Sequence, residues 1–474
     1  MIAYGFPPEG NAGSYRPLRF ARHLPELDWH PTVVTLDSEN YERYDSSLLE
    51  QVPADIDIIR VHNRDPWQVF QARRSERIQK QLAKASPEQT THILTAQQNP
   101  MRSRARELVR SIEAWCYHPD PAMGWIRPAV KATLKACQGE RPDVIWATAG
   151  PVSSLVVAAK VSRRIGVPYV LDFRDAWTIT FNEFEARRPA WAWLRIRRTM
   201  RQLLEGAQSV VFLYDTMAEC FRSAYPGAVN PDRVHIIPNG FDGEIDTSKP
   251  PKGDKCNVLY AGTLSSYRFD SLLEALVQLK RCDPAVAGRL RMTFIGEAME
   301  PLAQEVGTRG LKDIVETKPT VTHAEILEIQ RQAHAVLLLG RPRSMKGYEL
   351  FASAKLFGYL KSGRPIIGVL PEDESKKILR RVGVTTVADA ESPSEIVCAL
   401  YQLVKAWSEG RLESRSPDRL ACEAYSAERQ TAALVKALEG NPAPQAFVPG
   451  PAQIPDSLRE EMAGNGWSAC EASG

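Results

Sequence analysis

Two glycine-containing turns in the sequence have the composition of anion-binding sites. Gly10 and Gly13 follow an apolar run at residues 1–4, and Gly262 and Thr263 follow another at residues 257–260. Glycine lets the backbone approach a ligand closely, and the helix after each turn would point free N–H groups at an anion. One such turn is common in α/β proteins. Two of them, each opening one half of the chain, are a stronger indication of phosphate binding.

Two cations stand where a diphosphate at the second turn would need them. Arg268 precedes a helix expected from residue 270, and Lys355 lies in the first turn of a short helix that ends near Gly363. The dipole of a helix disfavours a cation at its start unless an anion lies nearby. Lys355 therefore favours a phosphate neighbour, with an ordinary surface lysine as the alternative.

A third group of polar residues follows an expected strand at residues 169–171. Asp172, Arg174, Asp175 and Trp177 come directly after it, and open α/β sheets bind ligands at the carboxyl ends of their strands. An arginine between two acids is equally expected in a structural ion pair. The sequence leaves both interpretations open.

Short β-branched runs alternate with helical patterns along most of the chain, which predicts an α/β fold with parallel sheets and crossover helices. The expected strands are residues 32–36, 56–61, 144–147, 169–171, 210–213, 234–237, 257–260, 291–295, 335–339, 365–369 and 385–387, and helices are expected at residues 14–24, 152–165 and 270–280. The run at residues 1–4 is short for a buried strand. Ser14 is the expected N-cap of the first helix.

With 474 residues the chain is too long for one core, so two α/β domains are expected. The glycines and prolines of residues 239–251 mark the boundary between them. We assign residues 1–240 to the first domain, with a polar helical insertion at about 65–130, and residues 241–424 to the second. Residues 441–474 are rich in Pro, Gly, Ala and Ser and predict a disordered tail.

The composition excludes several classes of protein. The net charge of +3 comes without a concentrated basic domain, which argues against nucleic acid as a partner. The eight cysteines show no CxxC spacing, so neither a zinc site nor a redox motif is expected. The sequence has no run of about 18 apolar residues and no signal-peptide pattern. We expect a soluble, cytoplasmic protein.

One basic amphipathic segment has two interpretations. The segment from Arg187 to Arg201 holds six arginines and no acid, with Trp193, Ile196 and Met200 on one helical face that Trp191 and Leu194 widen. Such a helix lies on an anionic membrane surface, or it packs its apolar face in the core and leaves its arginines in solvent. The first interpretation predicts peripheral contact with the inner face of a membrane.

Together these segments resemble family 4 of the retaining GT-B glycosyltransferases, in the bacterial subgroup that builds cell-surface polysaccharides. The matching pieces follow the family's order over most of the chain. They are the turn from Gly10 to Gly13, Asp172-Phe173-Arg174-Asp175-Ala176-Trp177, Ile237-Pro238-Asn239-Gly240-Phe241-Asp242, Tyr260-Ala261-Gly262-Thr263-Leu264, Phe294-Ile295-Gly296, and Lys355 to Pro365.

The resemblance implies two Rossmann-like domains facing a central cleft, with a helix at residues 425–440 returning to the first domain. The second domain would hold a UDP- or GDP-linked sugar as co-substrate, with no further cofactor and no metal. Arg268, Lys355 and Asp175 would be catalytic, the two cations by neutralising the departing diphosphate. Arg174, Asp175 and Trp177 would line the acceptor side. The implied donor contacts are Gly10, Gly13, Gly262, Thr263, Arg268, Glu349, Lys355 and Leu356.

Two positions depart from the family's pattern. The family's Glu-x7-Glu pair, whose second Glu holds the ribose, falls here on Leu350 and Gly358. Either the adjacent Glu349 substitutes for the missing carboxylate, or donor binding is altered. In addition, Arg174 stands where many members carry a histidine.

The expected activity is transfer of a hexose-type sugar, with retention, from a nucleotide-diphosphate sugar to a carbohydrate or lipid-linked acceptor. Two alternatives stay open. A nucleotide-sugar 2-epimerase shares the fold, and Gly358 motivates a non-catalytic GT-B protein that acts as a partner.

Overall fold

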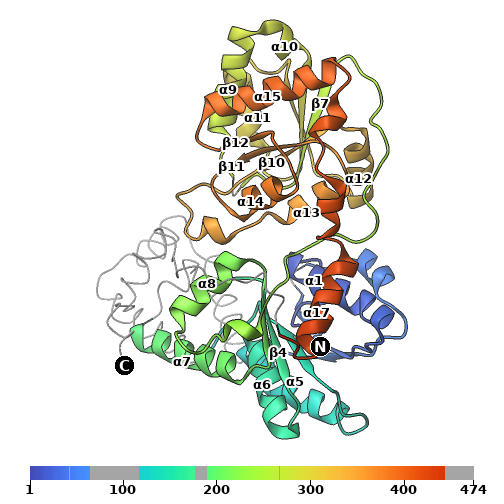
Figure 1. Cartoon of the computed structure of the whole chain (residues 1–474), viewed down its shortest axis with the longest axis vertical. Helices are drawn as coiled ribbons and strands as arrows, with labels where there is room; N and C mark the ends of the chain where they lie inside the picture. Colours follow the sequence, from blue (N-terminus) through green and yellow to red (C-terminus); the bar gives the residue numbers. More distant parts are fainter. Residues whose placement is uncertain (42, 64–116, 177–188, 266, 443–474) are drawn as a thin grey trace, which may run out of the picture. The chain divides into compact units, whose positions relative to one another are not determined.

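The computed structural model describes residues 1–41, 43–63, 117–176, 189–265 and 267–442 (Figure 1). The chain divides into two compact units, Met1–Ile237 with Thr431–Gly474, and Pro238–Gln430. The division after Ile237 lies next to residues 239–251, the stretch in which the sequence predicts the domain boundary. Each unit is built around one parallel sheet. The expected α/β fold with parallel sheets is confirmed.

The first unit contains a parallel sheet in two parts, ordered β2-β1 and β3-β4-β5-β6. Its strands are β1 (Val33–Leu36), β2 (Ile58–Val61), β3 (Ile145–Thr148), β4 (Tyr169–Phe173), β5 (Ser209–Phe212) and β6 (Val234–Ile236). The short run at residues 1–4 lies between the two parts, because Ile2 forms bridges with Val34 and with Ala147. This run is therefore reduced to a single bridging residue.

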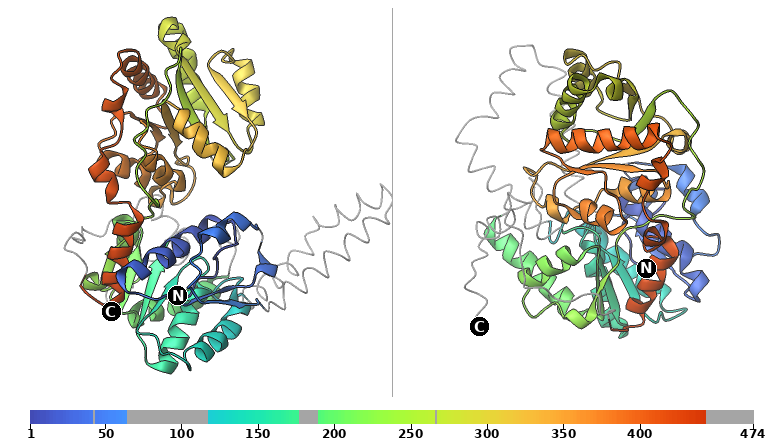
Figure 2. Two further views of the ribbon diagram at one scale, coloured as in Figure 1. Left: turned by 90° about the vertical axis from the view of Figure 1, so that its right-hand side faces the viewer. Right: turned by 45° about the horizontal axis from the view of Figure 1, so that its top comes forward.

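Helices α1 (Ala12–His23) and α17 (Ala427–Leu438) come from opposite ends of the described chain and share one core of the first unit. Figures 1 and 2 show the two helices side by side. Phe20 of α1 and Leu434 of α17 pack in the same cluster as Trp146, Val170 and Val211 of the sheet. The C-terminal helix therefore completes the core of the first unit.

The expected N-cap of α1 is wrong. The helix begins after Asn11, and Ser14 lies inside its first turn. The Ser14 hydroxyl donates to Glu9 Oε2 at 3.0 Å, so it is engaged away from the backbone N–H groups that a cap would bind.

The insertion expected at residues 65–130 is wrong at its C-terminal end, and residues 65–116 lie outside the described residues. Residues 123–130 belong to α5 (Met123–Ala136), which packs against β1, β2 and α6 (Ser153–Ile165). Trp125, Ile126 and Ala129 are buried there. The apolar face of α5 thus covers the sheet. The sequence did not predict this, because the polar residues before α5 obscure the apolar periodicity of the helix.

The basic segment forms α7 (Ala190–Gly206), which packs its apolar face inward. Trp193, Ile196 and Met200 are buried, whereas Trp191 and Leu194 are exposed. These two residues therefore extend the apolar face of the helix beyond the part that is packed in the core. Arg187 and Arg188 lie outside the described residues. No helix in the described ranges is long and apolar enough to cross a membrane.

The second unit contains a six-stranded parallel sheet in the order β12-β11-β10-β7-β8-β9. Its strands are β7 (Cys256–Ala261), β8 (Leu290–Ile295), β9 (Val315–Lys318), β10 (Ala335–Leu339), β11 (Ile366–Leu370) and β12 (Val387–Asp389). The sequence did not predict β9, because only Val315 of its four residues is buried. Strand β12 begins two residues later than predicted.

Helices cover this second sheet and supply its core. They are α9 (Asp270–Cys282), α10 (Pro284–Gly288), α11 (Glu300–Thr308), α12 (His323–Gln332), α13 (Ala354–Lys361), α14 (Glu374–Arg381), α15 (Pro393–Ser408) and α16 (Arg419–Glu423). Helices α9 and α15 pack against each other (Figure 1). Leu272 and Leu276 of α9 and Leu400 and Leu403 of α15 lie in one cluster with the strand residues. This packing fixes the carboxyl ends of the strands, where the candidate site lies.

The Pro-Asn-Gly-Phe-Asp segment connects two distant parts of the second unit. The Phe241 N–H donates to the Tyr425 carbonyl at 3.0 Å, and the Ala427 N–H donates to the Phe241 carbonyl at 2.9 Å. The segment therefore joins the start of the second unit to the residues that lead into α17. This gives the motif a structural role.

Candidate anion-binding site

Lys355 and Gly262 meet at the carboxyl end of β7. Lys355 is the second residue of α13, and Gly262 directly follows β7 with a φ of +130°. A Cβ atom built on Gly262 would lie 2.2 Å from Cε and 2.7 Å from Nζ of Lys355. Only glycine combines this backbone conformation with so close an approach. The structure thus brings together two of the residues that the sequence assigned to phosphate binding.

Two tyrosines surround the Lys355 ammonium. Nζ donates to the Tyr260 hydroxyl at 3.1 Å and lies 4.8 Å from the centroid of the Tyr260 ring. The Tyr267 ring centroid lies 4.9 Å from Nζ. A cation over an aromatic ring is attracted by the negative face of the ring. The Tyr260 hydroxyl in turn donates to the Thr263 carbonyl at 2.9 Å, which ties the glycine turn to the lysine.

The Lys355 ammonium has no carboxylate counter-ion among the described residues. Burial lowers the pKa of this group to about 8, because a desolvated ammonium loses its favourable hydration. An ammonium has three N–H donors, of which the described contacts use one, toward Tyr260. The geometry therefore suits an anionic ligand that supplies both the missing charge and the missing acceptors.

The other residues of the second unit that were predicted to contact the donor lie around the Lys355–Gly262 contact or outside it. The Thr263 hydroxyl donates to Glu297 Oε2 at 3.2 Å. Arg268 is exposed in the loop before α9, and Glu349 is partly buried in a single 3-10 turn, Tyr348–Leu350. Leu356 is fully buried, and its N–H donates to the Ser353 carbonyl. The Leu356 side chain thus anchors α13 in the core.

Gly358 lies on the exposed side of α13. A Cβ atom built there would meet nothing within 4 Å. The position at which the family carries its second Glu is therefore open to a larger side chain, and packing does not explain the glycine.

A second buried charge of this unit lies after β11. Asp373 caps α14 by accepting the Lys376 N–H on Oδ1 at 2.9 Å. Its Oδ2 is buried and finds no hydrogen-bond partner among the described residues. Burial raises the pKa of the Asp373 carboxyl to about 7. The acid was not predicted, because its sequence context, between Glu372 and Glu374, suggests a solvated loop.

In the first unit, Arg174 connects two loops at the carboxyl edge of the sheet through hydrogen bonds. Its guanidinium donates to the Gly13 carbonyl and, at 2.6 Å, to the Gly150 carbonyl. A Cβ atom on Gly13 would lie 2.3 Å from the guanidinium, so the glycine leaves room for the arginine. Arg174 and Gly13 therefore form a structural contact that the sequence did not predict.

The structural ion pair of this region joins different residues from those expected. Arg174 Nε lies 3.9 Å from Oδ2 of Asp175, a largely exposed carboxylate. Asp172 instead accepts from both Nε and Nη2 of Arg16, at 2.8–3.2 Å, and both side chains are buried. Arg16 was missed, although its position on the apolar face of α1, next to Leu18 and Phe20, was a readable signal.

Gly10 and Trp177 complete the predicted residues of the first unit. The Gly10 N–H donates to the Arg43 carbonyl at 3.1 Å, so this N–H is already engaged within the protein. Trp177 lies outside the described residues.

One group of potential metal ligands occurs in the described part of the chain. Asp37, Glu39 and His62 each offer a ligand atom, and these atoms lie within 4.8 Å of one another. Glu39 and His62 are exposed. Exposed acidic groups of this kind are common without an ion, and no other observation marks this group as a site.

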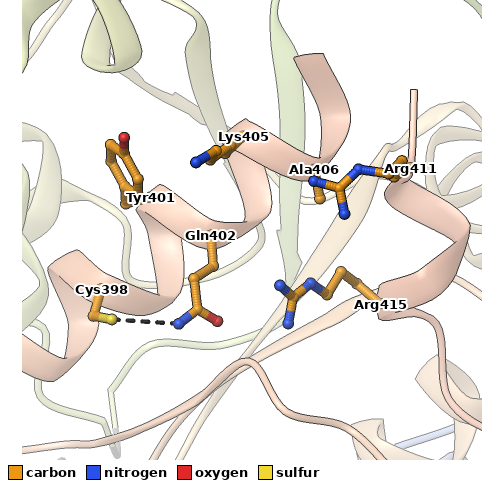
Figure 3. A pocket seen from close by; sticks show the side chains of 7 residues that line it. All are labelled: Cys398, Tyr401, Gln402, Lys405, Ala406, Arg411 and Arg415. Atoms are coloured by element: carbon orange, nitrogen blue, oxygen red, sulfur yellow. Dashed lines mark hydrogen bonds between the residues drawn. The ribbon is translucent and has the colours of Figure 1, made fainter. Parts of the chain in front are cut away.

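A groove of about 540 Å³ lies elsewhere on the second unit (Figure 3). Cys398, Tyr401, Gln402 and Lys405 of α15 line it together with Arg411 and Arg415. Cys398 and Gln402 are joined by a side-chain contact of 3.4 Å. No loop that follows β7, β8, β10 or β11 contributes to the groove. It is therefore separate from the site at the strand ends.

Comparison with known proteins agrees with this architecture. A model of Glycosyltransferase Family 4 matches residues 75–244. The fold is that of the GT-B glycosyltransferases, with two Rossmann-like domains. Comparison with curated protein sequences gives no match.

Three solved structures show the likeness. HepE from Anabaena, solved with UDP and glucose, is 14% identical with a TM-score of 0.55, over 92% of this chain and 98% of that one. Sucrose-phosphate synthase from Thermosynechococcus elongatus is 12% identical with a TM-score of 0.56, over 90% and 92%. The lipopolysaccharide outer core galactosyltransferase WaaB is 12% identical with a TM-score of 0.52, over 93% and 97%. At these identities the likeness establishes the fold.

Proposed function

We propose that this protein is a glycosyltransferase that transfers a hexose-type sugar, with retention, from a UDP- or GDP-linked donor. The acceptor is a carbohydrate or a lipid-linked molecule, and the product belongs to a cell-surface polysaccharide or glycoconjugate. One observation carries the proposal: the partly buried ammonium of Lys355 lies against the Gly262 turn at the carboxyl end of β7, without a carboxylate partner among the described residues. Open α/β sheets bind their ligands at this end of the strands.

The chemistry of the transfer explains why such an ammonium is useful. The acceptor hydroxyl replaces the nucleoside diphosphate at the anomeric carbon, and negative charge grows on the departing diphosphate. Cations already in place stabilise that charge without reorganisation. In this proposal Lys355 and Arg268 supply the positive charge, Thr263 and Glu349 contact the donor, and Arg174, Asp175 and Trp177 lie on the acceptor side. No metal is required.

The comparisons support the donor class. The match to Glycosyltransferase Family 4 covers part of the first unit. HepE was also solved with UDP-glucose, and WaaB is named as a galactosyltransferase. A protein of this class, placed on the cytoplasmic side of a membrane, would approach a lipid-linked acceptor through the basic segment from Arg187 to Arg201.

A thermal-shift panel of UDP-, GDP- and dTDP-sugars tests the proposal. A ligand held only by the folded state raises the melting temperature, by an amount that grows with the ratio of its concentration to its Kd. We expect one nucleotide class to stabilise the protein, and the same nucleotide sugar to be consumed only when an acceptor is added. Turnover of UDP-GlcNAc alone would instead identify a 2-epimerase.

Gly358 favours one competing function, that of a non-catalytic partner protein. The glycine replaces the carboxylate that would hold the ribose, and the space beside it is open. Absence of stabilisation by every sugar nucleotide of the panel would support this alternative and refute the transferase.

A further inference from the structure

The surroundings of Lys355 indicate a role for tyrosines to which no role was assigned from the sequence. Three phenols come close to this region: Tyr260 at the end of β7, Tyr267 in the following loop, and Tyr359 one turn along α13. The Tyr359 hydroxyl accepts the N–H of Ala261, the last residue of β7, at 3.3 Å. Tyr260 and Tyr267 are the two whose rings face the ammonium.

Tyr260 links the two halves of the anion site. Its hydroxyl accepts a hydrogen bond from Lys355 Nζ and donates one to the Thr263 carbonyl. A phenol has one donor and can accept from a cation at the same time, so one hydroxyl sets the distance between α13 and the Gly262 turn. Tyr267 contributes its ring face, and no hydrogen bond of its hydroxyl is found within the described residues.

We propose that Tyr260 is a positioning residue of the anion site: its hydroxyl holds the Lys355 ammonium against the Gly262 turn while leaving the charge of the lysine for the ligand to neutralise. The inference rests on the proposed function, because it specifies how the diphosphate of the donor would be received. A carboxylate in the same place would hold the lysine equally well but would compete with the diphosphate for its charge. A phenol avoids this competition.

A consequence of this arrangement is that ligand binding and protonation of Lys355 are coupled. The groups that face the ammonium are the phenol rings of Tyr260 and Tyr267, and Tyr359 lies one turn along α13 with its hydroxyl bonded to the Ala261 N–H. The Glu297 carboxylate accepts a hydrogen bond from the Thr263 hydroxyl. Burial holds the pKa of Lys355 at about 8. An anion beside the ammonium favours its charged form, so binding raises this pKa. Affinity for UDP-glucose should then fall as the pH rises above about 8.

The matched variants are Tyr260→Phe and Tyr267→Phe, each of which keeps its ring. Removing the Tyr260 hydroxyl takes one acceptor from the ammonium and releases the Thr263 carbonyl. We expect it to weaken UDP-glucose binding about five- to tenfold, which corresponds to the net contribution of one ordinary hydrogen bond, because the lost bond positions the ammonium and does not contact the ligand. Tyr267→Phe keeps the ring that faces the ammonium and removes no described hydrogen bond, so its effect on binding should be smaller than that of Tyr260→Phe. In a Lys355→Ala background, Tyr260→Phe should have little further effect, because coupled residues are not additive.

A second measurement needs no ligand. Acylation of Lys355 by acetic anhydride, followed across pH by peptide mass spectrometry, reports the fraction of the lysine that is neutral. The exposed Lys405 is the internal reference. We expect Lys355 to react with an apparent pKa near 8, and this value to fall in Tyr260→Phe and to stay in Tyr267→Phe. Bound UDP-glucose should protect Lys355.

These measurements separate the inference from the proposed function. If no nucleotide sugar binds the wild type but the acylation profiles behave as expected, the transferase fails and the positioning role stands. The positioning role is overturned if Lys355 titrates like Lys405, if both phenylalanine variants give the same profile as the wild type, or if Tyr260→Phe weakens binding equally with and without Lys355. A loss of binding accompanied by a similar drop in melting temperature for both variants would also overturn it.

Discussion

Each unit has a cation beside a glycine turn, and the two cations differ in their hydrogen-bond partners. In the first unit the Arg174 guanidinium lies against Gly13 and Gly150 and donates to their carbonyls. In the second, the Lys355 ammonium lies against Gly262 and donates to a single phenol. The arginine has its acceptors inside the protein, whereas the lysine keeps donors for a ligand. Similar glycine turns in the sequence therefore do not imply similar roles.

The same contrast extends to the buried charges. The first unit pairs Arg16 with Asp172 in the core, through hydrogen bonds from Nε and Nη2 of the arginine. The second unit keeps Lys355 without a carboxylate partner in the described residues and leaves Asp373 with one oxygen atom unbonded. Uncompensated buried charge reduces stability, and functional sites commonly retain such strain. From this comparison we expect the ligand-binding chemistry in the second unit, and the substitutions below test that expectation.

The largest effect is expected for Asp172→Ala. It leaves the Arg16 guanidinium buried without its carboxylate, and breaking a buried pair in this way lowers the free energy of unfolding by about 3–5 kcal/mol. Urea denaturation followed by circular dichroism measures the change. Asp175→Ala, which removes a largely exposed carboxylate, should stay within about 0.5 kcal/mol of the wild type. Equal effects of the two variants would show that the Arg16–Asp172 pair is not a core element.

Lys355→Ala and Arg268→Ala should each weaken donor binding or turnover by about tenfold or more, because a hydrogen bond to a charged group contributes about 1.5–3 kcal/mol. Folding should be retained, and in Lys355→Ala the removal of a desolvated ammonium should leave the melting temperature unchanged or higher. Calorimetric titration with UDP-glucose gives the affinities. Lys405→Ala is the matched control on the surface of α15. Wild-type kinetics in both variants would rule out this placement of the diphosphate.

Asp373→Asn should stabilise the protein at neutral pH. The pKa of Asp373 is raised from 3.8 to about 7, so the folded state holds a proton that the unfolded state has released. Stability therefore falls as the pH rises from about 4 to about 7, and the full penalty applies above that range. The asparagine keeps the cap and removes the penalty, a gain of up to about 4 kcal/mol at pH 8 that disappears near pH 4.

Glu372→Gln provides a control of opposite sign for that experiment. Hydrogen bonding to Arg380 lowers the pKa of the Glu372 carboxyl to about 2. Its contribution to stability is present above the unfolded pKa and is lost as the pH falls. Melting temperatures across pH for the two variants should therefore diverge in opposite directions. Parallel curves would contradict the assignment for Asp373.

The smallest effect is expected for Gly358. Glycine inside a helix is less stable than alanine by about 0.5–1 kcal/mol, so Gly358→Ala should raise the free energy of unfolding by that amount. The space around the position accepts the new side chain. Gly358→Glu should fold as well and, under the proposed function, should bind the nucleotide sugar more tightly than Gly358→Ala. Equal affinities would show that this position lies away from the ribose.

The sequence determined the elements whose pattern is local. Apolar β-branched runs placed β7, β8, β10 and β11 to within a residue or two, because a strand buried on both faces is marked by its own composition. The position of Lys355 in the first turn of α13 and the glycine at the end of β7 were also local features. The paired glycine turns and the cations beside them could therefore be proposed before the fold was known.

Only the tertiary structure decided what these residues contact. The partner of Asp172 is Arg16, 156 positions earlier in the chain, and the group beside Lys355 is Tyr260, 95 positions earlier. Contacts at such separations depend on how strands and helices pack, which no local pattern records. The edge strand β9 was missed for a related reason, since three of its four residues are not buried. The sequence therefore shows where the charged residues lie along the chain, and the packing of the fold determines which of them have a partner of opposite charge.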